Sequence, residues 1–192
     1  MLFVLLLKYA TRSASLTRHN NTMQFQLHIN NNGAGYEGSW KDGMRHGGGK
    51  RTYADGRVYV GNWKEDKKHG FGKYTYPDGR VYEGHWEDGK KRGWGEMNHA
   101  DGRVYEGNWK DDKRHGEGKY TYADGNVYEG NWKNDLVHGW GKATYADGEV
   151  YEGHWEDGNC HGWGKYTWAD GDVYEGNWKD DKYHGWGKMT YA

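Results

Sequence analysis

The chain has 192 residues and combines few aliphatic side chains with 33 glycines, 12 tryptophans and 17 tyrosines. A single proline excludes a collagen-like or proline-rich chain, and the aromatic content of 17% argues against the disorder that low hydrophobicity otherwise indicates. The formal net charge of -1 excludes a polycation that binds nucleic acid, and the lone Cys160 excludes an intramolecular disulfide. Any buried surface must therefore be aromatic.

The first 23 residues resemble a tail more than part of a folded domain. The apolar run at residues 2–7 is far shorter than the roughly 20 residues that span a bilayer. The segment carries Lys8, Arg12 and Arg18 and no acidic residue, as organelle transit peptides do. We therefore expect residues 1–23 to be a disordered or targeting-like N-terminal tail.

Residues 24–35 predict an irregular first element. The stretch from Gln24 to Ile29 alternates like a strand, and residues 30–33 fall in register with residues 53–56 of the next unit. Its apolar residues have the opposite parity to the aromatic residues of later units. Two interpretations stay open: a degenerate half-repeat, and a cap that folds over the units that follow.

A 23-residue period organises the rest of the chain. A tyrosine recurs at this spacing, and a tryptophan follows it four positions later in all seven units. Each unit reads Tyr-Glu-Gly-x-Trp, a charged turn, His-Gly-x-Gly-Lys, a run rich in Thr and Tyr, and Ala-Asp-Gly, with few departures. Residues 36–192 therefore form an array of about seven repeats, which begin at Tyr36, Tyr59, Tyr82, Tyr105, Tyr128, Tyr151 and Tyr174.

The stretch from Tyr151 to Lys165, YEGHWEDGNCHGWGK, shows the unit most clearly. It resembles the MORN repeat, and the resemblance recurs in phase over residues 36–192. The resemblance implies one antiparallel β-hairpin per repeat, a role in recognising proteins or phospholipids, and frequent homo-oligomers.

The residues of each unit also predict two strands by themselves. In the second repeat, a period of two places Tyr59, Gly61 and Trp63 on one face of the first strand. The same period places Tyr74 and Tyr76 on one face of the second strand. Each repeat therefore presents one aromatic face.

Two turns per repeat connect these strands into a meander. In the second repeat we expect a charged turn at residues 64–69 and a tight hairpin at residues 77–79, where Asp-Gly suits positive φ values. Glycines on the aromatic face leave gaps in which rings can lie flat, and the repeats must stack because one hairpin cannot bury its rings alone. The predicted fold is all-β: an elongated, single-layer, twisted antiparallel β-meander with one hairpin per 23-residue repeat.

The aromatic stripe is the candidate binding surface. Its rings are first needed as the thin core between repeats, but a one-layer sheet cannot cover both faces, so part of the stripe should stay accessible. The tryptophans at the x of Gly-x-Gly differ between repeats and suit a partner helix or peptide. The candidate partner-binding residues are Tyr59, Trp63, Tyr74, Tyr76, Trp94, Trp109, Trp132, Trp140, Trp155, Trp163 and Trp186.

Other recurring residues predict no chemistry. Equivalent histidines would lie about 10 Å apart along the sheet, whereas zinc needs nitrogen ligands about 2.0 Å from one point. The stretch from Gly47 to Lys50 lacks the helix and the Ser or Thr that follow a phosphate-binding loop. Carboxylates recur in every unit instead of forming one convergent pair. We therefore expect no metal, no cofactor and no catalytic residue.

These features predict a non-catalytic scaffold for protein interaction or assembly, which acts through the aromatic trough and an open sheet edge near Gly187 to Tyr191. The edge would mediate homo-oligomer formation. Two alternatives stay open: a phospholipid or membrane-surface binding module, which the net charge of -4 in residues 36–192 disfavours, and the regulatory part of a larger, truncated enzyme. The expected location is the cytoplasm, with peripheral association at membranes or the cytoskeleton.

Overall fold

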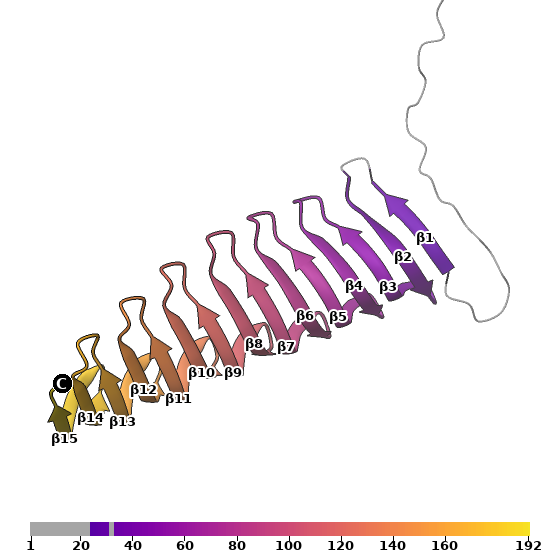
Figure 1. Ribbon diagram of the computed structural model, residues 1–192. Coiled ribbons are helices and arrows are strands. Elements are labelled where there is room, and N and C mark those ends of the chain that lie inside the picture. Colours follow the sequence, from indigo (N-terminus) through magenta and orange to yellow (C-terminus); the bar gives the residue numbers. More distant parts are fainter. Residues whose placement is uncertain (1–23, 31–32) are drawn as a thin grey trace, which may run out of the picture. The chain divides into compact units, whose positions relative to one another are not determined.

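A computed structural model describes residues 24–30 and 33–192, so the predicted tail at residues 1–23 lies outside the described residues. Fifteen antiparallel strands follow one another in sequence order in one open sheet, which confirms the predicted all-β meander (Figure 1). In these residues no helix is present that could cross a membrane. The strands are β1 (Gln24–Ile29), β2 (Gly35–Lys41), β3 (Met44–Thr52), β4 (Val58–Lys64), β5 (Lys67–Thr75), β6 (Val81–Glu87), β7 (Lys90–Asn98), β8 (Val104–Lys110), β9 (Lys113–Thr121), β10 (Val127–Lys133), β11 (Leu136–Thr144), β12 (Val150–Glu156), β13 (Asn159–Thr167), β14 (Val173–Lys179) and β15 (Lys182–Thr190).

The chain divides into two compact units. The first comprises the described residues up to Val81 together with residues 86–89, and the second comprises residues 82–85 and 90–192. Strands β1 to β5 pair with their sequence neighbours within the first unit. Strands β7 to β15 do so within the second. The same hairpin pattern therefore recurs inside each unit.

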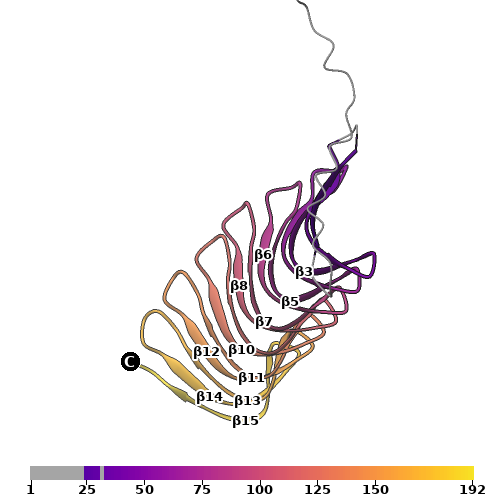
Figure 2. The same ribbon diagram turned by 90° about the vertical axis from the view of Figure 1, so that its right-hand side faces the viewer.

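Each hairpin pairs its strands through glycine. In the fifth repeat Gly130 faces Gly141 within the hairpin, and it also faces Gly118 of the preceding strand. The register within the hairpin then shifts between Gly130 and Trp132. Such an irregularity bends a strand, and the strands are visibly curved in Figure 2.

A tyrosine ring explains why these positions are glycine. Tyr128 is 2% exposed, and its hydroxyl donates to the carbonyl of Asn131 at 2.9 Å. A Cβ on Gly141 would overlap the Tyr128 ring, and a Cβ on Gly130 would meet the backbone of Gly141. The prediction that glycines leave room for flat rings is therefore confirmed.

The first turn of each repeat is shorter than the sequence indicated. In the second repeat Glu65 and Asp66 both have positive φ values, 48° and 65°, and β5 begins at Lys67. The prediction of a turn over residues 64–69 was wrong at its C-terminal end. Two consecutive positive φ values match the twist of a hairpin, so the chain reverses within two residues.

The Asp-Gly turn lies at the predicted residues 77–79 but has a different backbone conformation. Only Gly79 of the Asp78-Gly79 pair has a positive φ, of 86°. The amide of Tyr76 donates to the carbonyl of Arg80 at 2.9 Å, and the amide of Gly79 donates to the carbonyl of Tyr76 at 3.1 Å. These bonds enclose residues 77–79, where the turn was predicted, and the loop needs one left-handed residue instead of an Asp-Gly pair with two positive φ values.

The terminal strands differ from the others in exposure. In β1, which pairs with β2, Phe25 and Ile29 are 59% and 56% exposed, so these apolar residues do not enter the core. In β15, which pairs with β14, every residue is exposed. Strand β15 is last in the strand order, and self-association through this edge stays a prediction.

Burial changes the acidity of the core tyrosines. Burial raises the pKa of Tyr36 to about 12, against a smaller lowering by Arg45. Burial likewise raises the pKa of Tyr105 and Tyr128 well above the ordinary value of 10. The folded state therefore retains phenolic protons that the unfolded chain releases above about pH 10.

Substitution of two neighbouring glycines tests the fit between tyrosine and glycine. Gly49→Ala should lower the free energy of unfolding by about 1–3 kcal/mol, because the new Cβ would overlap the Tyr36 ring. Gly48→Ala is the matched control, since its Cβ would meet nothing within 4 Å and should change stability by less than about 0.5 kcal/mol. Urea unfolding followed by tryptophan fluorescence measures both, and equal losses would contradict the account.

Alkaline titration tests the buried tyrosines. Because their folded pKa values are raised, stability should be fully present below about pH 10 and should fall as pH rises toward the folded values. Urea midpoints measured between about pH 8 and pH 12 should therefore decline only in the upper part of that range. The urea midpoint of Tyr128→Phe should decline less steeply with pH than that of the parent. An unchanged slope would show that Tyr128 does not contribute to the pH dependence of stability.

Candidate functional site

In the second repeat and in the fourth to the seventh, the tryptophan of the Tyr-Glu-Gly-x-Trp motif packs between the tyrosines of two successive repeats. The ring of Trp155 lies 5.5 Å from that of Tyr128 and 5.0 Å from that of Tyr151, both edge to face. Its Nε1 donates to the carbonyl of Gly141 at 3.2 Å. One ring therefore joins two repeats by packing and by a hydrogen bond. We call the side of the sheet that carries these rings the aromatic face.

Most of the predicted partner-binding residues belong to this core. Tyr76 is half-buried, and the six others on the aromatic face are at most 9% exposed. A partner cannot reach these six rings while the repeats remain packed. The six residues are Tyr59, Trp63, Tyr74, Trp109, Trp132 and Trp155.

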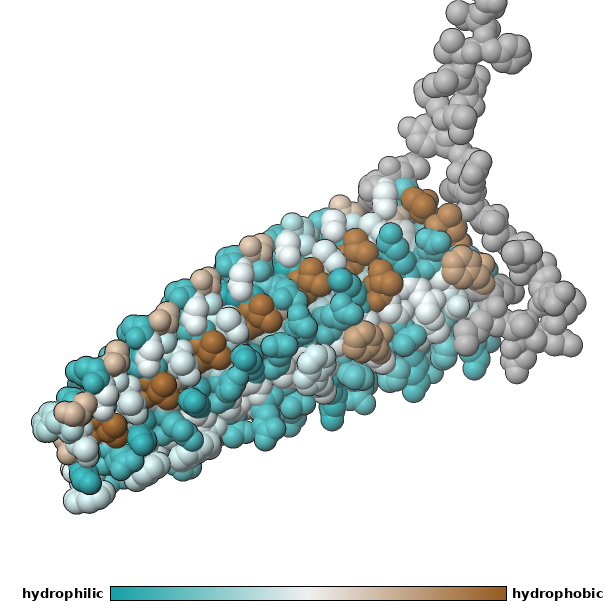
Figure 3. Space-filling view, viewed as in Figure 1, coloured by the Kyte–Doolittle hydropathy of each residue, from teal (hydrophilic) through white to brown (hydrophobic). Residues whose placement is uncertain are grey.

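The tryptophans at the x of Gly-x-Gly lie on the opposite face and are exposed. We call Trp94, Trp140, Trp163 and Trp186 the tryptophan column; their exposed fractions are 50%, 41%, 45% and 71%. In the view of Figure 3, strongly hydrophobic residues appear as separate spots among hydrophilic ones, so the side in view has no continuous aliphatic patch. The tryptophan column therefore provides most of the large apolar contact area that we find at the Gly-x-Gly positions.

Two members of the tryptophan column are brought together. The rings of Trp140 and Trp163 are stacked, with centroids 6.1 Å apart and an interplanar angle of 8°. His154 packs edge-on against Trp140 at 5.1 Å. Trp94 lies two repeats before Trp140, and the repeat between them has Glu117 at the equivalent position. In the fifth and sixth repeats the structure thus joins two exposed rings into one aromatic surface.

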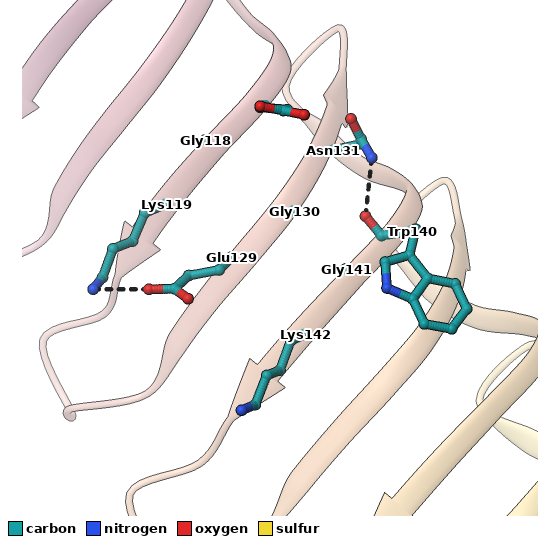
Figure 4. A pocket seen from close by; sticks show the side chains of 9 residues that line it. Gly118, Lys119, Glu129, Gly130, Asn131, Trp140, Gly141 and Lys142 are labelled. Atoms are coloured by element: carbon teal, nitrogen blue, oxygen red, sulfur yellow. Dashed lines mark hydrogen bonds and ion pairs between the residues drawn. The ribbon is translucent and has the colours of Figure 1, made fainter.

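A shallow pocket of about 470 Å³ adjoins Trp140 on the same face. Figure 4 shows glycine backbone between the charged side chains on one side and Trp140 on the other. Lys119 and Glu129 form an ion pair at 2.8 Å, which raises the pKa of Lys119, and the Asn131 amide donates to the carbonyl of Trp140 at 3.1 Å. The pocket is lined by Glu117, Gly118, Lys119, Glu129, Gly130, Asn131, Trp140, Gly141 and Lys142. It offers a flat, polar rim beside an exposed ring.

Two of the recurring histidines lie near carboxylates. In His161 the Nε2 atom lies 3.3 Å from the Glu156 carboxylate and Nδ1 lies 3.9 Å from that of Asp180. His138 Nδ1 lies 3.6 Å from the Asp157 carboxylate. In the described part of the chain, no group of three or more His, Cys, Asp and Glu side chains could hold a metal ion.

Cys160 is part of the aromatic face. Its side chain is buried, and burial raises the pKa of the thiol to about 12, with a further contribution from Asp181. The sulfur is therefore protonated near neutral pH and is a weak nucleophile.

A column of cations, which was not predicted from the sequence, lies above the core rings. Four repeats carry a cation one residue before the histidine position. Arg45 lies 4.3 Å from the ring centroid of Trp63, and Lys68 lies 3.6 Å from that of Trp86. Lys91 and Arg114 each lie 4.2 Å from a ring centroid, of Trp109 and Trp132 respectively. The 23-residue spacing of these cations was the available signal. Their side chains cover the tryptophans by cation–π contact.

The sequence comparison identifies this architecture. The MORN repeat family matches residues 36–56, 59–79, 82–102, 105–127, 128–150, 151–173 and 174–192. The chain belongs to the MORN repeat family. This confirms the predicted array of about seven repeats over residues 36–192. No curated protein matches this MORN chain significantly.

The solved structures that match this chain are distant in sequence. The TCP domain of SAS-4 (dCPAP) from Drosophila melanogaster, in complex with a proline-rich motif of Ana2 (dSTIL), is 12% identical to this MORN chain with a TM-score of 0.49. The similarity covers 93% of this chain and 97% of that domain. A mutant of the TCP10 domain of Danio rerio CPAP is 14% identical, with coverages of 98% and 100% and a TM-score of 0.37. Neither score is high enough to carry a property of those domains over to this chain.

A pair of tryptophan substitutions separates the two faces of this MORN array. Trp155→Ala should lower the free energy of unfolding by about 3–5 kcal/mol, because it removes a buried ring shared by two repeats. Trp163→Ala, eight residues away on the exposed face, should cost less than about 1 kcal/mol. Urea denaturation of both variants measures the difference, and similar losses would show that the tryptophan column is also structural.

Proposed function

We propose that this MORN array is a non-catalytic scaffold that binds a protein partner through Trp140, Trp163 and Trp186. The observation that carries the proposal is the stacked, exposed pair of Trp140 and Trp163 on the face opposite the core. Large aromatic side chains supply much contact area at low conformational cost and are enriched at protein interfaces.

The fold itself does not require tryptophan at these positions. The first repeat has Gly48 there and the fourth has Glu117, and both pair with the next strand in the register that Trp140 and Trp163 adopt. A side chain that the sheet tolerates as glycine, glutamate or tryptophan has no structural role in common. Tryptophan at this position is therefore best explained by contact with another molecule.

Recurring polar groups support a scaffold more than an enzyme. The core tyrosine hydroxyls donate to backbone carbonyls, as Tyr151 does to His154 at 2.9 Å. Carboxylates and histidines recur along the sheet, and His138, His154 and His161 line one shallow pocket together with Glu156. Most of these groups belong to the repeating pattern, whereas an active site needs a distinct set of residues, so the arrangement favours surface binding.

The phospholipid alternative has less support from the charges. Arg45 and Lys68 point over core rings, and Lys119 and Lys165 are paired with Glu129 and Glu175. Cations engaged in this way are poorly placed to gather against an anionic leaflet. Lipid binding stays a prediction from the resemblance, and it is a separate arm of the test.

Affinity capture tests the protein-binding proposal. With the chain as bait, bound proteins are quantified for the parent and for the triple variant Trp140→Ala, Trp163→Ala and Trp186→Ala. The triple variant should lose at least about 90% of a specific partner, since removal of central aromatic anchors typically costs 2 kcal/mol or more in binding. The control variant, Leu136→Ala with Tyr191→Ala, removes exposed apolar residues outside the column and should retain the partner.

Vesicle co-sedimentation provides the second arm. Neutral phosphatidylcholine vesicles, with and without a phosphoinositide, should leave the chain in the supernatant. Two results together would overturn the proposal in favour of lipid binding: salt-sensitive pelleting with phosphoinositide vesicles, and capture of protein partners that the triple substitution does not change.

A further inference from the structure

The cations above the core rings are confined to the first four repeats. The positions that correspond to Arg114 in the fifth, sixth and seventh repeats hold Val137, Cys160 and Tyr183. In the fourth repeat the Arg114 guanidinium lies over three rings, at 4.2 Å from Trp132, 5.1 Å from Tyr120 and 5.8 Å from Tyr105. The rings of the later repeats are therefore not covered by a cation from this column.

A second set of cations changes in the same direction. Arg57 and Arg80 lie 4.9 and 4.7 Å from the rings of Tyr53 and Tyr76. In the sixth repeat Trp168 takes the place of Tyr76, and Asp172 takes the place of Arg80. Trp168 is thus a larger ring, with a carboxylate where the earlier repeats have a guanidinium.

The rings of the last two repeats surround a pocket of about 510 Å³ on the aromatic face, in which Tyr183 is 50% exposed and Trp178 is 7% exposed. Four of its six lining residues are aromatic: Tyr166, Trp168, Trp178 and Tyr183. Trp178 and Tyr183 meet at 4.8 Å with an interplanar angle of 65°, and Trp168 and Tyr183 meet at 6.5 Å and 72°. Rings inclined to one another in this way present several electron-rich faces to one cavity.

Charged groups at the pocket favour a cation. Asp181 lines the pocket; one carboxylate oxygen accepts the Cys160 amide at 2.7 Å, and the side chain is exposed. Lys182 is also at the rim and is exposed, and its equivalents Lys67 and Lys90 reach outward to carboxylates at 3.2 and 3.3 Å. A flexible lysine of this kind leaves the space between the rings open.

The surrounding repeats are acidic. Residues 128–192 contain 12 Asp and Glu against 6 Lys and no Arg, a net charge of -6, whereas residues 36–127 contain 16 acidic against 18 basic residues, a net charge of +2. The repeats that lack covering cations are therefore also the repeats that attract them from outside.

We propose that this pocket receives a lysine or arginine side chain of a partner protein. The cation lies on the aromatic face, as Arg114 and Lys68 do in earlier repeats, with the accessible Trp168 and Tyr183 as its rings and Asp181 as its counter-ion. A choline headgroup would offer a similar cation, but its phosphate would face the acidic surface. This site lies on the face opposite the tryptophan column and does not depend on it.

Nuclear magnetic resonance of the tryptophan indole N–H groups tests the proposal directly. The probes are the capped peptides Gly-Gly-Lys-Gly-Gly and Gly-Gly-Arg-Gly-Gly, and a third peptide with norleucine at the centre. The two cationic peptides should shift the Trp168 and Trp178 signals and leave Trp94 and Trp140 unmoved. Affinity should fall as ionic strength rises, and norleucine should produce no shift.

A matched pair of substitutions supplies the control. Cys160→Arg places a guanidinium where Arg114 lies in the fourth repeat, so it should cover Trp178 and weaken peptide binding at least about fivefold. Val137→Arg makes the same change one repeat earlier, outside the pocket, and should leave binding unchanged. Asp181→Asn keeps an acceptor for the Cys160 amide and removes the charge, and it should weaken binding about threefold.

Three results would overturn the proposal. The first is equal shifts with norleucine and lysine peptides, which would indicate apolar contact alone. The second is an equal affinity of the Cys160→Arg and Val137→Arg variants for the cationic peptides, while both variants retain the dispersed indole signals of the folded parent. The third is phosphocholine binding more tightly than the lysine peptide. Loss of partner capture in the tryptophan-column variant would be independent of all three.

Discussion

A tyrosine ring packed on glycine backbone is the contact on which every repeat depends. Tyr128 lies over Gly130 and Gly141, where no Cβ fits, and its hydroxyl is satisfied by a carbonyl three residues along the same strand. This contact holds the ring in place for the next one, because Trp155 packs its ring against Tyr128. The sheet has no second layer, so these rings replace the aliphatic core of an ordinary domain.

This constraint gives the two faces of the sheet different sequence requirements. The aromatic face must keep Tyr, Gly and Trp in phase, since each ring serves two repeats. The opposite face has no such requirement, and the same position holds Gly48, Glu117 or Trp163. Differences between repeats can therefore accumulate there without loss of stability, and that face carries the proposed binding surface.

Differences also appear on the aromatic face where the cations change. Arg45, Lys68, Lys91 and Arg114 cover tryptophans within the chain, whereas Cys160 and Tyr183 leave rings that an external cation can cover. Where a repeat supplies this cation, the chain itself covers the ring. Where the cation is missing, a cation of a partner can bind. The acidic balance of residues 128–192 acts in the same sense, because it attracts such a cation over longer distances than a ring does.

The sequence alone determined the period, the family, the strand order and the aromatic face, because a 23-residue spacing and a two-residue alternation are properties of the chain itself. The place of the tight turn at Glu65 and Asp66 was decided by the hairpin twist, which forces positive φ on residues that do not usually adopt it. Only the tertiary structure decided which candidate rings are accessible: Trp155 is enclosed by the tyrosines of two repeats, whereas Trp163 stacks on Trp140 in the open. Accessibility depends on neighbours from other repeats, and spacing along one chain does not contain that information.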